Sequence, residues 1–125
     1  MNTQTVTTTE VKSYDSRNHS RFRFRLQADA HIEGQGVFRG FVKDISLQGV
    51  TLYLDRNLLK DKSVQIRIHV PPAATTEKAY SVVATGKTIH SIFDSDELNF
   101  RLGIKLLYFA SEADETYLKK YLKIR

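Results

Sequence analysis

Two arginines four residues apart, Arg17 and Arg21, are the first side chains of this sequence whose type and spacing suggest specific chemistry. The planar guanidinium fork can donate two parallel hydrogen bonds to a phosphate. The same fork matches the O6 and N7 acceptors of guanine, and the flat cation stacks on a base. Two such forks at this spacing could close on opposite sides of one compact anionic ligand. The alternative is a solvated basic strand face, because Arg23 and Arg25 follow with no acid between them.

A second motif, D-x-S-x-x-G, runs from Asp44 through Ser46 to Gly49. An ionised Asp44 only accepts hydrogen bonds, and the N1–H and N2–H₂ groups of guanine form a paired donor edge for it. Ser46 can donate to a phosphate or base acceptor, or brace Asp44. Gly49 permits a positive φ and a close approach of ligand to backbone. A plain β-turn is the alternative, but cations together with a carboxylate favour recognition of a guanine dinucleotide over a generic polyanion.

A second R-x-x-x-R match, from Arg21 to Arg25, overlaps the first. Apolar alternation starts directly after Arg21, with Phe22 and Phe24 on the side opposite the arginines. We therefore predict that Arg17 and Arg21 lie on the loop that enters the first strand. Arg25 is expected inside that strand, where the sheet fixes the backbone.

Alternation and turn residues predict six β-strands along the chain. They are expected from Arg21 to the glycines at 34 and 36, and at about 37–45, 50–54, 64–70, 80–92 and 99–108. A helix is expected at about 111–123, after a capping box formed by Ser111 and Asp114. Strands without interleaved helices predict an antiparallel barrel or sandwich. If the first two strands form a hairpin, the residues before the first meet those after the second, which brings the two motifs together.

The composition is that of one ordinary globular domain, with 125 residues and a formal net charge of +5 that favours anionic ligands. The absence of cysteine removes disulfides and thiol chemistry, and the four histidines are isolated in the sequence. No nucleophile elbow or phosphate-binding glycine loop with Lys-Ser/Thr is present. The acids Asp94 and Asp96 are interpreted as turn residues. We therefore expect no enzyme, no metal site and no cofactor.

Residues 1–14 are polar and without a usable period, so a flexible tail is expected there. That stretch shows no secretory signal, and the apolar runs of the sequence are far too short to span a membrane. A cytoplasmic protein is the resulting expectation.

The order R-x-x-x-R, apolar strand, D-x-S-x-x-G resembles the PilZ domain family. The stretch Leu102-Gly-Ile-Lys-Leu106 followed by a helix resembles the last strand and terminal helix of that family. The resemblance implies a six-stranded antiparallel β-barrel with one C-terminal α-helix, over residues 15–125, that binds cyclic di-GMP, a bacterial second messenger. It implies binding roles for Arg17, Arg21, Asp44, Ser46 and Gly49.

In the family the R-x-x-x-R segment wraps the ligand, and the rearrangement is passed to a partner. The resemblance therefore implies an adaptor that regulates an unidentified effector protein in motility, adhesion or biofilm formation. Some members carry a further arginine directly before the motif, which often accompanies binding of a stacked ligand dimer. Ser16 occupies that position here, so the sequence leaves the stoichiometry open.

Two other functions stay open at this point. One is a PilZ-like interaction module that binds no nucleotide. The other is an oligonucleotide-binding barrel in which aromatic side chains stack on bases, although no nucleic-acid partner is expected. The candidate aromatic residues are Phe22, Phe24, Phe38, Phe41 and Tyr53.

Overall fold

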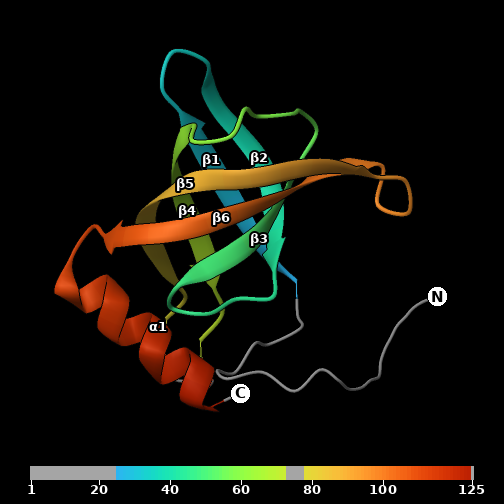
Figure 1. The fold of residues 1–125 in the computed structure, drawn as a ribbon. Helices are drawn as coiled ribbons and strands as arrows, with labels where there is room; N and C mark the ends of the chain where they lie inside the picture. Colours follow the sequence, from blue (N-terminus) through green and yellow to red (C-terminus); the bar gives the residue numbers. More distant parts are fainter. Residues whose placement is uncertain (1–24, 73–77, 125) are drawn as a thin grey trace.

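Six antiparallel strands form a closed barrel, followed by one helix, in the computed structural model, which describes residues 25–72 and 78–124 (Figure 1). The strands are β1 (Leu26–Ile32), β2 (Gly36–Lys43), β3 (Gly49–Leu54), β4 (Ser63–Val70), β5 (Tyr80–Asp94) and β6 (Asn99–Phe109). The helix is α1 (Glu112–Ile124). Around the barrel the order is β1-β2-β3-β6-β5-β4, and pairing of β1 with β4 closes it. The predicted barrel with one C-terminal helix is confirmed.

The core lies inside the barrel because each strand turns every second side chain inward. In β4 this alternation is complete from Ser63 to Val70, with the apolar side chains buried and the polar ones exposed. Fully buried side chains from the different strands meet at the barrel axis, among them Ile32, Leu52, Ile66, Ile68 and Leu102. The outward side chains are consequently free to build a binding surface on the barrel wall.

The β1–β2 hairpin turns at Gly34 and Gly36, as the sequence predicted. Gly34 and Gly36 adopt positive φ values of 81° and 117°, a region that side chains with a Cβ rarely enter. The register that follows places Leu26 opposite Val42. The start of β1 and the end of β2 therefore lie side by side at one end of the barrel (Figure 1).

The first strand begins later than the sequence alternation predicted. β1 starts at Leu26, so Arg25 precedes the strand and is not fixed in the ladder. The prediction that Arg25 lies inside the strand was therefore wrong, and the sequence argument that set it apart from Arg21 no longer holds. Residues 1–24, with the expected tail, Arg17, Arg21 and the two early phenylalanines, lie outside the described residues.

Helix α1 begins at a side-chain cap, as the sequence predicted, but the acid of the capping box, Asp114, has further partners. The backbone N–H of Asp114 donates to Ser111 Oγ at 3.1 Å, which is the expected cap. The Asp114 carboxylate, however, reaches β5, where it accepts from Tyr80 Oη at 2.6 Å and from the Val83 N–H at 2.9 Å. The Tyr80 ring also stacks on Tyr117 of the helix, with centroids 4.4 Å apart. Asp114 therefore ties α1 to the barrel.

Burial of the Asp114 carboxyl would raise its pKa, but the hydrogen bonds from Tyr80, Val83 and Ser111 together hold the pKa below its ordinary value. The hydrogen bond to Asp114 in turn raises the pKa of the Tyr80 phenol. The stable arrangement at neutral pH is therefore an ionised carboxylate next to a neutral phenol.

Within residues 25–72 and 78–124, no helix has the length and apolar character needed to cross a bilayer.

Candidate functional site

The D-x-S-x-x-G motif forms the connection between β2 and β3, at the end of the barrel where β1 begins (Figure 1). Asp44 follows β2 directly and adopts a positive φ of 50°, which Asp tolerates better than most residues. Ile45 is fully buried and anchors the turn in the core. Leu106 of β6 donates its N–H to the Gln48 carbonyl at 2.9 Å. The turn is thus held by the core on one side and by β6 on the other.

Ser46 uses its hydroxyl to hold this turn together. Its Oγ accepts from the N–H groups of Gln48 and Gly49, each at 3.2 Å, and donates to the Gly49 carbonyl at 3.2 Å. The side chain is 8% exposed. The sequence suggested that Ser46 could brace Asp44. In the structure its hydroxyl braces the backbone of the turn at Gln48 and Gly49.

Gly49 is required for a reason that the sequence did not reveal. Its φ is not positive, so that part of the prediction was wrong. Instead, a Cβ on Gly49 would lie 2.8 Å from the carbonyl oxygen of Ile104 on β6, closer than real Cβ contacts. The glycine therefore permits close approach of β3 to β6, and this approach fixes the turn against the sheet.

Gly49→Ala is expected to lower the free energy of unfolding by about 1–3 kcal/mol, because the backbone of β6 must move to admit the methyl group. Urea denaturation of the purified variant measures this. Gly34→Ala is a comparison variant with the other kind of cost: nothing lies within 4 Å of its added Cβ, and only the strain of its positive φ of 81°, about 1 kcal/mol, is expected. The steric account is wrong if Gly49→Ala is as stable as the wild type.

Outward side chains beside this turn form a continuous row across four strands. Lys43 lies opposite Thr51, Thr51 opposite Gly103, and Gly103 opposite His90. A Cβ on Gly103 would lie 2.4 Å from His90 Nε2, so the exposed imidazole covers this glycine. Sequence reasoning left His90 aside as an isolated histidine. A glycine within the alternating pattern of β6 was the available signal for a close approach.

The neighbouring row adds positive charge to the same wall. Gly49 lies opposite Lys105, and Lys105 opposite Lys87, both of them exposed lysines. The wall of β3, β6 and β5 next to the D-x-S-x-x-G turn therefore combines cations, a flat imidazole and little steric bulk.

Two aromatic rings stack on the outer face near the start of β1. Phe41 and Tyr53 lie opposite each other with centroids 4.7 Å apart. Burial raises the pKa of Tyr53, and the nearby carboxylates of Asp94, Asp44 and Glu97 raise it further against the effect of Arg101. The phenol therefore stays neutral. Asp94 and Glu97 belong to the β5–β6 turn and Asp44 to the D-x-S-x-x-G turn, so the charges of both turns act on the Tyr53 phenol.

A separate groove of about 400 Å³ lies between the D-x-S-x-x-G turn and the start of α1. Leu47 contributes to its lining, together with Leu106, Leu107, Tyr108, Phe109, Ser111, Glu112 and Glu115. The only charged groups of this lining are carboxylates, so the groove does not suit a phosphate ligand.

In the described part of the chain, no group of three or more His, Asp or Glu side chains is placed to hold a metal ion. His69 pairs with Asp29 at 3.0 Å.

Asp94 is a turn residue, as interpreted from the sequence. Its carboxylate accepts hydrogen bonds from the N–H groups of Asp96 and Glu97.

Comparison with known proteins identifies the fold and the family. The PilZ domain matches residues 15–123, nearly the whole chain. The chain belongs to the PilZ domain family. No curated protein matches it in sequence. The family assignment therefore rests on the domain match, with the barrel and its terminal helix as the structural counterpart.

Two solved structures share the fold of this PilZ domain. One is the Bacillus subtilis inhibitor of motility MotI/DgrA, with a TM-score of 0.68 and 15% identity over 90% of this chain. The chain spans about half of that protein, 52% of its length. The other is the PilZ domain of YcgR from Escherichia coli, determined with c-di-GMP. Its TM-score is 0.57 at 16% identity, over 84% of this chain and 87% of that one.

Proposed function

We propose that this PilZ domain is a receptor for cyclic di-GMP, with a binding site formed by Arg17, Arg21 and the turn that contains Asp44, Ser46 and Gly49. The guanidinium groups of Arg17 and Arg21 would bind phosphate and guanine, and Asp44 would accept the donor edge of the base. Both family motifs are intact in the sequence. The PilZ domain of YcgR, which shares the fold, was solved with this ligand.

The observation that carries the proposal is the register of β1 and β2. Because Leu26 lies opposite Val42, the chain enters β1 beside the end of β2, where the D-x-S-x-x-G turn starts. Arg21 precedes Leu26 by five residues, a span of at most about 18 Å. The two motifs therefore need no rearrangement of the barrel to reach a common ligand.

The surface next to the turn has the charge that such a ligand requires. Lys43, Lys87 and Lys105 face outward from neighbouring strands, and His90 offers a flat ring over Gly103. A cyclic dinucleotide carries two phosphates and two bases, so it suits a wall that combines cations with a flat ring.

The receptor would act as an adaptor without catalytic activity. Ordering of the R-x-x-x-R segment on the ligand would change the surface presented to an unidentified effector protein. A receptor of this second messenger would act in the cytoplasm. The oligonucleotide alternative gains little from the aromatic residues, since Tyr53 is 5% exposed and the Phe41 ring is already covered by the guanidinium of Arg25.

Calorimetric titration with cyclic di-GMP tests this function. We expect binding with a Kd in the low micromolar range or tighter, about −8 kcal/mol. Cyclic di-AMP and GTP serve as controls, because they lack either the guanine edge or the cyclic pair of phosphates. The absence of heat with cyclic di-GMP, while the protein is folded, would remove the proposal and favour an interaction module that binds no nucleotide.

A further inference from the structure

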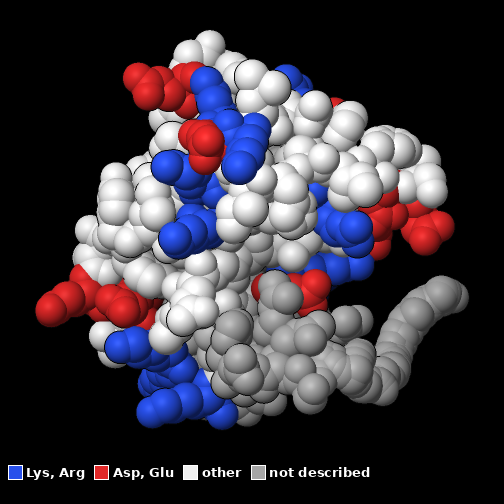
Figure 2. Space-filling model, viewed as in Figure 1, with Lys and Arg blue, Asp and Glu red and all other residues white. Residues whose placement is uncertain are grey.

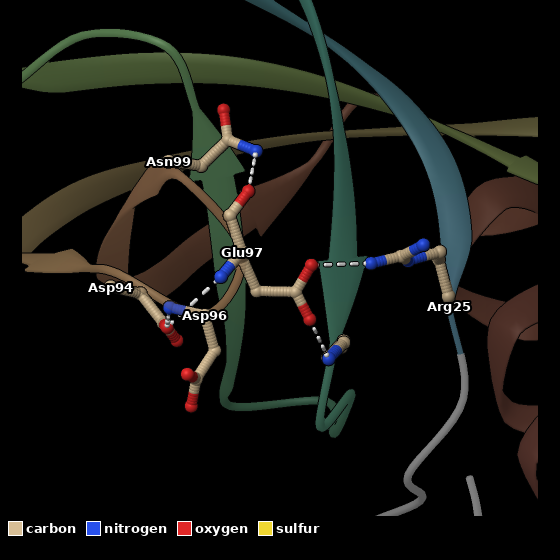
Figure 3. Close-up of polar contacts among 6 residues, drawn as sticks. Arg25, Asp94, Asp96, Glu97 and Asn99 are labelled. Atoms are coloured by element: carbon tan, nitrogen blue, oxygen red, sulfur yellow. Dashed lines mark hydrogen bonds and ion pairs between the residues drawn. The ribbon is translucent and has the colours of Figure 1, made fainter. Parts of the chain in front are cut away.

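The carboxylate of Glu97 lies between two cations that flank the proposed ligand motifs. It accepts from Arg25 Nη2 at 2.6 Å (Figure 3). It also accepts from Lys43 Nζ at 2.8 Å. Arg25 precedes β1, four residues after Arg21, and Lys43 directly precedes Asp44. Acidic side chains at the end of the β5–β6 hairpin accordingly lie next to Lys and Arg side chains in Figure 2. One carboxylate thus pairs with one cation near each motif.

The β5–β6 turn is built to hold Glu97 at this place. Asp94 Oδ1 accepts from the N–H of Asp96 at 3.0 Å and from that of Glu97 at 3.2 Å (Figure 3). The Asp94 carbonyl accepts from the Leu98 N–H at 2.8 Å. Asn99 Nδ2 donates to the Glu97 carbonyl at 3.0 Å. The backbone around Glu97 is therefore fixed by its own turn, while only the carboxylate reaches the cations.

The two cations are also positioned by aromatic rings. The Arg25 guanidinium lies 4.0 Å from the centroid of Phe41, and Lys43 Nζ lies 5.3 Å from that of Tyr53. Cation–π contacts of this kind hold a charge over a ring without neutralising it. Removal of the Glu97 carboxylate would therefore leave both cations in place and available to another anion.

We propose that Arg25 and Lys43 bind a phosphate of the same ligand, and that Glu97 is an internal counter-ion which this phosphate displaces. The inference rests on the proposed function and adds two binding residues and a competing group to it. A carboxylate and a phosphate make the same charge-assisted hydrogen bonds to these donors. The ion pairs are partly exposed, with side-chain exposures of 54% for Arg25, 32% for Lys43 and 23% for Glu97. Pairs of this exposure are weak, so a ligand with two negative charges can displace the carboxylate.

Glu97→Gln tests the competition. This variant is expected to bind cyclic di-GMP about three to ten times more tightly than the wild type, because the ligand no longer displaces two ion pairs. Asp96→Asn is the matched control: it removes the same charge from the same turn, from an exposed side chain that makes neither ion pair, and is expected to stay within about twofold. Lys43→Gln is expected to weaken binding about tenfold.

The outcomes separate this inference from the proposed function. If the wild type binds cyclic di-GMP and Glu97→Gln binds no more tightly than Asp96→Asn, the competition is refuted and the receptor function stands. If the wild type gives no heat, the receptor function fails, and inorganic pyrophosphate followed by NMR then probes the anion site by itself. Equal pyrophosphate binding by the wild type and Glu97→Gln overturns the anion site as well. Thermal melting of each variant verifies that it is folded.

Discussion

Arg21→Ala is expected to lower the affinity for cyclic di-GMP by about 100-fold, a loss of about 2.7 kcal/mol. The guanidinium is proposed to donate charge-assisted hydrogen bonds and to stack on a base, and neither interaction can be replaced by a methyl group. Calorimetric titration of wild type and variant under one buffer and salt concentration measures the difference. The stability of the barrel should be unchanged, because Arg21 precedes the first residue of β1.

Arg39→Ala provides the matched control for this experiment. It removes the same charge from an exposed position within β2, where Arg39 lies opposite Asp29 near the middle of the β1–β2 hairpin. Affinity is expected to stay within about twofold of the wild type, because an exposed charge away from the ligand acts only through the screened field. Equal losses in the two variants would indicate a non-specific polyanion surface in place of a dinucleotide site.

Asp114→Ala is expected to lower the free energy of unfolding by about 3 kcal/mol. The substitution leaves the Val83 N–H and the Tyr80 hydroxyl without their acceptor and removes the contact with the capping hydroxyl of Ser111. Urea denaturation followed by circular dichroism measures the loss. Glu115→Ala is the control, since the Glu115 side chain forms an exposed pair with Lys119 at 3.7 Å, and we expect a change below about 0.5 kcal/mol.

The same carboxylate gives this loss a pH dependence. Its pKa in the folded protein is lowered from the ordinary value of 3.8, so its contribution is complete at pH values above 3.8 and is lost as pH falls through the folded-state pKa. The stability difference between wild type and Asp114→Ala is therefore expected to shrink in acid. A difference that stays constant from pH 7 down to pH 2.5 would show that the ionised form of Asp114 contributes nothing.

The strands and the helix were predictable because each carries its own period. The alternation of β4 gave the inward and outward faces directly, and the pattern ending at Tyr121 and Leu122 gave the helix. The prediction from local alternation was wrong at Arg25. The alternation in the sequence starts at Arg21, whereas β1 starts at Leu26, because the start of a strand depends on pairing with its partner.

Within the candidate site, the β2–β3 turn was predictable because its motif is contiguous in the sequence. The D-x-S-x-x-G turn was found, but its sequence does not distinguish a glycine needed for a positive φ from one needed for close packing against Ile104. Glu97 was missed because its partners, Arg25 and Lys43, lie 72 and 54 positions away along the chain. These contacts arise because β6 pairs with β3 and β3 with β2, and no local spacing encodes such pairing.

The place of Glu97 in a surface turn has an evolutionary consequence. Turns of this kind tolerate substitution and changes of length, because no buried side chain depends on them. A relative with the same two motifs but another residue at this position, or a longer turn, would keep the barrel and lose the competing carboxylate. Such relatives would respond to different concentrations of the messenger, so the threshold of the response can diverge while the recognition residues stay the same.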